Sequence, residues 1–102
     1  MKIYRQGDVI LRKIEGEWIS VILQEIKEYP FKAKKDDKLI IKGETGNDHI
    51  LEAPVYEIYN RTYVILEKPE ILKHPEHQEI EIEPGIYQVD RVRDFRNGYR
   101  GD

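Results

Sequence analysis

Apolar and polar residues alternate along most of this chain, which is typical of strands that bury one face. The clearest stretch is 78–83, where glutamine and glutamates alternate with isoleucines, and Pro84-Gly85 then turns the chain into a second such stretch at 86–92. Further stretches of this kind occupy 9–14, 38–42, 49–52, 55–59 and 62–66. We therefore predict a mainly β fold, a small barrel or sandwich of seven or eight short strands with little helix.

The segment between residues 18 and 29 fits two structures. Its large apolar residues Trp18, Ile22 and Ile26 recur at helical spacing, whereas the run Trp-Ile-Ser-Val-Ile-Leu also suits a strand. Because no clear N-cap residue precedes the segment, we favour a strand. The charged residues 32–38 that follow are predicted to form a loop.

The length of 102 residues fits one domain that spans 1–102, in which 96–102 is predicted to be a flexible tail. The absence of cysteine excludes disulfides, zinc–thiolate sites and thiol nucleophiles. No apolar run approaches the roughly 18 residues of a membrane helix, and the N-terminus lacks a signal-peptide pattern. We therefore expect no membrane partner and a cytoplasmic protein, and its bias towards Ile, Glu and Lys is typical of thermophiles.

The net charge of −3 argues against binding along a long nucleic acid duplex, where affinity depends on neutralised phosphates. It leaves room for a short oligonucleotide in a local basic pocket. A domain of this size also has few ways to protect its edge strands, so we expect a two-fold homodimer.

Three histidines are the best candidates for chemistry, because imidazole exchanges a proton near neutral pH. His49 follows the glycine-containing turn 43–48, and His74 and His77 flank Pro75-Glu76. This set could instead bind a metal, as His/His/Glu sets do in cupin-type barrels, although the HxH motif that opens such sites is absent. Three histidines can equally be ordinary structural side chains.

Arginines offer candidate phosphate ligands, because the guanidinium fork matches phosphate oxygens. Arg91 and Arg93 are two positions apart on the last predicted strand, so their side chains point to the same face. Arg93 could equally form an ion pair with the aspartate beside it. Near the N-terminus, Tyr4, Arg5 and Gln6 supply a phenol, a cation and an amide just before a Gly-Asp turn. The chain has no nucleophile elbow, P-loop or dinucleotide fingerprint.

Several short blocks occur in a fixed order along nearly the whole chain. They are RQGDV at 5–9, GETGNDH at 43–49, HPEH at 74–77, PGIYQV at 84–89 and RDF at 93–95. Together they resemble a family of small bacterial and phage proteins with the blocks RQGDV, GExTGHxH, HxEH, PGxYxV and RE followed by Tyr or Phe. That family includes CRISPR-associated extrinsic ring nucleases, which cut the cyclic oligoadenylate messengers of type III CRISPR systems.

The resemblance implies a β-rich dimer and metal-independent cleavage without a cofactor. The chain departs from the pattern at Asn47, which stands where the first histidine of GHxH is expected. The catalytic candidates are then His49, His77 and Arg93, and the substrate-binding candidates are Tyr4, Arg5, Gln6, Asn47, His74 and Arg91.

Metal-free RNA cleavage uses the neighbouring 2′-hydroxyl as nucleophile and yields a 2′,3′-cyclic phosphate. It requires an acceptor for the hydroxyl proton, a donor for the leaving 5′-oxygen and a cation for the transition-state charge, which histidine and arginine can provide. A symmetric cyclic oligoadenylate would suit the interface of a two-fold dimer. The alternatives are a non-catalytic nucleotide-binding or interaction module and a metal-binding cupin-like protein.

Overall fold

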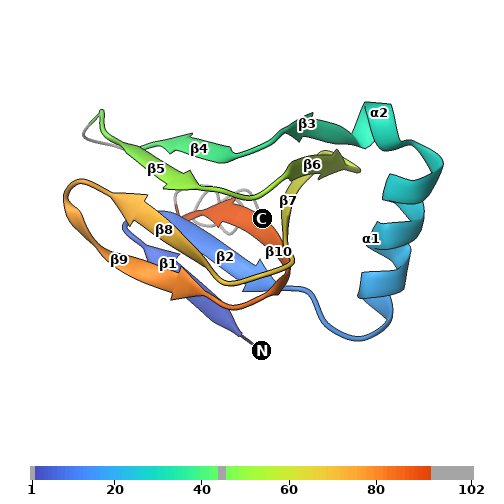
Figure 1. The fold of residues 1–102 in the computed structure, drawn as a ribbon, viewed down its shortest axis with the longest axis horizontal. Coiled ribbons are helices and arrows are strands. Elements are labelled where there is room, and N and C mark those ends of the chain that lie inside the picture. Colours follow the sequence, from blue (N-terminus) through green and yellow to red (C-terminus); the bar gives the residue numbers. More distant parts are fainter. Residues whose placement is uncertain (1, 44–45, 93–102) are drawn as a thin grey trace, which may run out of the picture.

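The computed structural model describes residues 2–43 and 46–92, which fold into two antiparallel sheets flanked by a helix (Figure 1). One sheet has six strands in the order β1-β2-β10-β7-β6-β3, and the other has four in the order β4-β5-β8-β9. The elements are β1 (Ile3–Gln6), β2 (Val9–Lys13), α1 (Glu17–Glu28), α2 (Pro30–Ala33), β3 (Lys34–Asp36), β4 (Leu39–Lys42), β5 (Asp48–Leu51), β6 (Val55–Ile58), β7 (Arg61–Leu66), β8 (Glu70–His74), β9 (His77–Ile82) and β10 (Gly85–Arg91).

The prediction of a mainly β fold is confirmed. The described residues contain ten strands rather than seven or eight, because β1, β3 and β8 lie outside the predicted stretches. β1 and β3 have only four and three residues and show little alternation. The predicted tail at 96–102 lies outside the described residues.

The main core lies between the two sheets. Leu11 and Tyr87 of the six-stranded sheet meet Leu51 and Leu72 of the four-stranded sheet, and all four side chains are fully buried. Burying side chains of this size stabilises the fold by roughly 1.5–3 kcal/mol each. The two sheets are therefore held as one sandwich by apolar packing.

A second core on the outer face of the six-stranded sheet explains why the segment at 17–28 is helical. Ile22 of α1 is buried against Ile58, Tyr63 and Ile86, and Ile26 packs beside it. The prediction of a strand here is wrong. The helix has no side-chain N-cap, so packing of its apolar stripe onto the sheet stabilises it in place of a local capping signal.

The prediction of a loop at 32–38 is also wrong, because this segment enters α2 and then β3. Pro30 begins α2, where its fixed φ suits the first turn and its missing N–H costs no hydrogen bond. Ala33 is buried in the second core. The three exposed charged residues of β3 form the end strand of the sheet, where charge discourages pairing with other chains.

Three turns meet at one end of the sandwich, on the left in Figure 1, and carry the residues of interest. They join β1 to β2, β4 to β5 and β8 to β9. In the first, Gly7 and Asp8 form a two-residue hairpin loop in which Gly7 has a φ of 58°. A II′ turn requires such a φ at its first central residue, and glycine adopts it freely.

Candidate functional site

The three histidines come from two of these turns and pack ring against ring. The ring centroids of His49 and His74 lie 4.3 Å apart, those of His74 and His77 4.5 Å, and those of His49 and His77 5.8 Å. His49 is 1% exposed and His74 is 6% exposed, whereas His77 is exposed to solvent. This histidine cluster therefore has two buried members and one at the surface.

Gln6 determines which nitrogen of His49 carries the proton. The Gln6 amide nitrogen donates to the backbone oxygens of Leu72 and Gln78, at 2.9 and 3.0 Å. Its amide oxygen therefore faces His49 Nδ1, 2.9 Å away, and can only accept. Hence Nδ1 carries the hydrogen and Nε2 of the neutral ring has a free lone pair.

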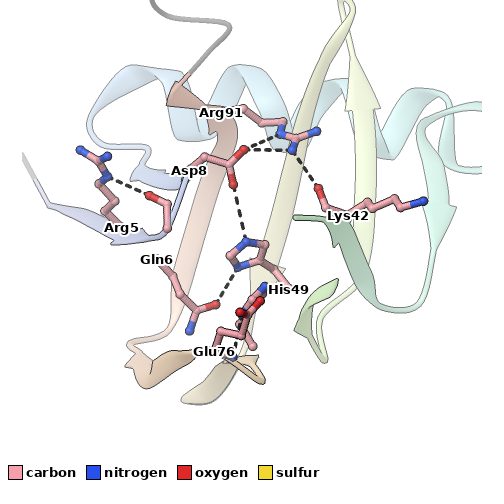
Figure 2. A network of polar contacts seen from close by, with 9 residues as sticks. Arg5, Gln6, Asp8, Lys42, His49, Glu76 and Arg91 are labelled. Atoms are coloured by element: carbon pink, nitrogen blue, oxygen red, sulfur yellow. Dashed lines mark hydrogen bonds and ion pairs between the residues drawn. The ribbon is translucent and has the colours of Figure 1, made fainter. Parts of the chain in front are cut away.

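The lone pair of His49 Nε2 faces an ion pair between Asp8 and Arg91 (Figure 2). Asp8 Oδ1 lies 3.6 Å from Nε2, too far for a hydrogen bond, while Asp8 Oδ2 accepts from the Arg91 terminal nitrogen at 2.9 Å. The same arginine nitrogen donates to the Lys42 carbonyl at 2.8 Å. Asp8 thus becomes an ion partner of His49 only when that ring is protonated.

Burial and charge shift the pKa values of both groups. Burial lowers the pKa of His49, and the neighbouring His74 lowers it further, although the charge of Asp8 opposes these effects. Burial raises the pKa of Asp8, but its hydrogen bond and charge interaction with Arg91 outweigh this, so the net pKa lies below its usual value. His49 is therefore neutral and Asp8 ionised at neutral pH.

These shifts predict a pH-dependent stability. Because the pKa of folded His49 is below the usual 6.5, the unfolded chain binds more protons, and the free energy of unfolding should fall as pH decreases through 6.5. A second loss should follow below about pH 4, as Asp8 is protonated. Urea unfolding of His49→Gln should lack the first decrease, while the same change at exposed His77 should retain it. A native protein whose stability is constant between pH 7.5 and 5.5 would contradict the assignment.

Two glycines make room for the cluster. A Cβ atom at Gly7 would lie 2.7 Å from His77 Nε2, and one at Gly43 would lie 3.0 Å from His74 Nε2. His74 Nδ1 accepts the backbone N–H of Glu76 at 3.0 Å, so its Nε2 carries the hydrogen in the neutral ring. The backbone of the first two turns therefore packs directly against the imidazole edges.

The exposed rim of the cluster contains His77, and an exposed cation bonds the glycine that packs against it. Arg5 Nε donates to the Gly7 carbonyl at 2.9 Å, and a Cβ atom at Gly7 would lie 2.7 Å from His77 Nε2, so both side chains contact the same glycine. On another side, Asn47 Nδ2 donates to Glu76 Oε1 at 2.8 Å and links the two histidine-bearing turns. Arg5 and His77 are thus the rim groups that a phosphodiester could reach.

Among residues 2–43 and 46–92, no group of three or more His, Asp or Glu side chains is arranged to hold a metal ion. Gln6 occupies Nδ1 of His49, and the Glu76 N–H occupies Nδ1 of His74. In the same residues, no helix is long and apolar enough to cross a membrane.

A family model described as Domain of unknown function (DUF8820) matches residues 5–92. The chain belongs to this family. The DUF8820 range includes the histidine cluster with Arg5 and Arg91, and it leaves out Tyr4 and Arg93. No curated protein and no solved structure matched the chain.

The predicted site residues fall into three groups. Arg5, Gln6, Asn47 and the three histidines come together, and Arg91 joins them through Asp8. Tyr4 instead contacts Tyr87 and hydrogen-bonds Glu83, and Arg93 lies outside the described residues.

Asp8 and Glu76 are the site residues that sequence reasoning missed. Both belong to blocks that stood out in the sequence, RQGDV and HPEH, but their partners are remote. Asp8 pairs with a residue 83 positions away, and Glu76 with one 29 positions away. An aspartate after the glycine of a two-residue hairpin turn is the one local signal that could have marked Asp8.

Proposed function

We propose that this chain is a metal-independent ring nuclease, which degrades cyclic oligoadenylate messengers of type III CRISPR defence by attack of a 2′-hydroxyl on the adjacent phosphodiester. The observation that carries the proposal is the exposed His77, which packs against the buried imidazoles of His49 and His74 and contacts the same glycine, Gly7, as the exposed Arg5. The ordered sequence blocks point to the substrate class. Because this messenger acts inside the cell, the proposal places the protein in the cytoplasm, where we expect it as a homodimer.

His77 is the acid/base group of the proposed reaction. It accepts the proton of the 2′-hydroxyl as that oxygen bonds to phosphorus, and it returns the proton to the 5′-oxygen as the phosphorus–oxygen bond breaks. The products are a 2′,3′-cyclic phosphate and a 5′-hydroxyl. Arg5 stabilises the additional negative charge on the phosphate oxygens, and Arg93 remains a candidate for the same task.

The burial of His49 assigns it a positioning role in this scheme. At 1% exposure it does not reach a substrate, but its ring supports those of His74 and His77. The neutral ring of His49 places no positive charge next to His77. Gln6 fixes the tautomer of His49 on one side, whereas the charge of Asp8 on the other side favours protonation but is outweighed by burial and by His74. Arg91 acts through Asp8 rather than through phosphate.

The decisive experiment incubates purified protein with cyclic tetra-adenylate in the presence of EDTA. We expect a linear product that ends in a 2′,3′-cyclic phosphate, identified by mass spectrometry. His77→Ala, purified in the same way, reports any contaminating nuclease. Intact substrate after prolonged incubation with excess enzyme overturns the proposal.

A non-catalytic nucleotide-binding module is the second candidate, and Asn47 is the observation in its favour. Asn47 replaces the first histidine of the resembled pattern, and its side chain is tied to Glu76. In that case cyclic tetra-adenylate would raise the melting temperature and stay intact. Arg5→Ala would abolish the rise, because its exposed guanidinium would bind a phosphate of the ligand.

A further inference from the structure

Exposed apolar side chains concentrate on the two helices, at the end of the molecule opposite the histidine cluster (Figure 1). Residues 2–43 and 46–92 contain nine large apolar side chains that are exposed, and six of them lie between 18 and 31. Apolar surface gathered in this way marks an interaction site more often than a plain solvent face. The six are Trp18, Ile19, Val21, Leu23, Tyr29 and Phe31.

One face of α1 has a protruding side chain at its N-terminal end and a pocket at its C-terminal end. Trp18, Val21, Glu25 and Tyr29 follow each other at intervals of three and four residues, so they form a stripe beside the buried Ile22. Trp18 is 68% exposed at the N-terminal end of the stripe. At the other end, about 16 Å along the helix axis, Glu25 and Tyr29 line a pocket of about 300 Å³.

The chemistry of the pocket matches that of Trp18. Its walls include the aromatic rings of Tyr29 and Tyr59 together with the carboxylates of Glu25 and Glu57. An indole has a large apolar ring system and one N–H donor. It binds well where the ring system is buried and the N–H donates to an acceptor. A carboxylate has room for several donors.

The charges at the two ends of the stripe are complementary as well. Glu17 lies next to Trp18 in the first turn of α1, and Lys32 lies on the wall of the pocket. Both are exposed. When two copies of α1 lie antiparallel about a two-fold axis, Trp18 of each copy meets the pocket of the other, and Glu17 meets Lys32.

We propose that the Trp18 stripe of α1, with the pocket at its end, is the interface of a symmetric homodimer in which each Trp18 inserts into the pocket of the second copy. A second copy fits this face because Trp18 and Glu17 lie at the N-terminal end of α1, whereas the pocket lies at its C-terminal end and Lys32 of α2 lies beyond that end. The interface does not depend on the proposed nuclease chemistry. In this dimer each histidine cluster lies at the end of its protomer away from the interface, and each cluster is formed by one protomer alone.

The test measures the mass of the full chain by sedimentation equilibrium over a range of concentrations. We expect a dimer for the native chain and a dissociation constant about 100-fold higher for Trp18→Glu, with an unchanged circular dichroism spectrum. Ile40→Glu is the matched control, because Ile40 is half exposed on β4, outside the stripe, and the variant should remain a dimer.

A charge exchange tests the orientation of the two copies. Glu17→Lys and Lys32→Glu should each weaken the dimer, and the double variant should restore it, because the pair re-forms with reversed charges. A native chain that stays monomeric at every concentration overturns the proposal. A dimer that Trp18→Glu leaves unchanged also overturns it, since another surface must then hold the two copies.

Discussion

His77→Ala is expected to lower the rate of cyclic tetra-adenylate cleavage by about 10²–10⁴-fold, because general acid–base catalysis contributes that much. His77 is the exposed member of the histidine cluster, so the variant should keep its free energy of unfolding within about 0.5 kcal/mol. The loss should appear in kcat more than in KM, since Arg5 still binds phosphate. Rates from single-turnover assays and stability from urea unfolding measure the two effects separately.

Gln78→Ala is the matched control for His77. Gln78 is the next residue of β9 and is exposed, and only its backbone oxygen takes part in the site, as an acceptor for Gln6. Its activity should equal that of the native chain. If His77→Ala retains full activity while folded, His77 is not the acid/base group, and the proposed mechanism fails at its first step.

Alternation predicts the strands well because burial of one strand face is a local, repeating constraint. Both faces of β7 are buried, so its sequence is apolar at successive positions. Val64 lies in the core between the sheets, and Tyr63 on the other face packs against α1. The helix is missed for the opposite reason. Its stability comes from Ile22 contacting three strands, and the local sequence offers Gly16 where a capping side chain would stand.

The histidines could be named from the sequence, but their arrangement could not. His49 and His74 are 25 positions apart in the chain, and their rings meet because β5 pairs with β8. Strand pairing of this kind is a property of the whole sheet. The role of Gln6 was hidden for the same reason: its amide contacts β5, β8 and β9 while it lies on β1. An amide next to an arginine in RQGDV suggested substrate binding, whereas its burial gives it a positioning role.

Gln6→Leu is expected to destabilise the native chain by about 3 kcal/mol, although leucine has a similar size. Gln6 is 3% exposed, and the change leaves the carbonyls of Leu72 and Gln78 and the Nδ1–H of His49 without their partner. A buried polar group left unsatisfied costs about 1–3 kcal/mol, and partial relaxation offsets some of the sum. Urea unfolding at pH 7.5 measures the loss.

Two further variants separate the hydrogen bonds of Gln6 from its volume. Gln88→Leu removes a half-buried amide whose partner within residues 2–43 and 46–92 is Asp90 of its own strand, so a loss below about 1 kcal/mol is expected there. Gln6→Glu keeps the shape but directs a carboxylate at the two carbonyls, so it should be destabilised at pH 7.5 and recover relative to the native chain as falling pH protonates it. If Gln6→Leu were no more harmful than Gln88→Leu, the amide would not hold His49. Both tautomers of His49 would then be open, and Gln6 would no longer determine which ring nitrogen carries the proton.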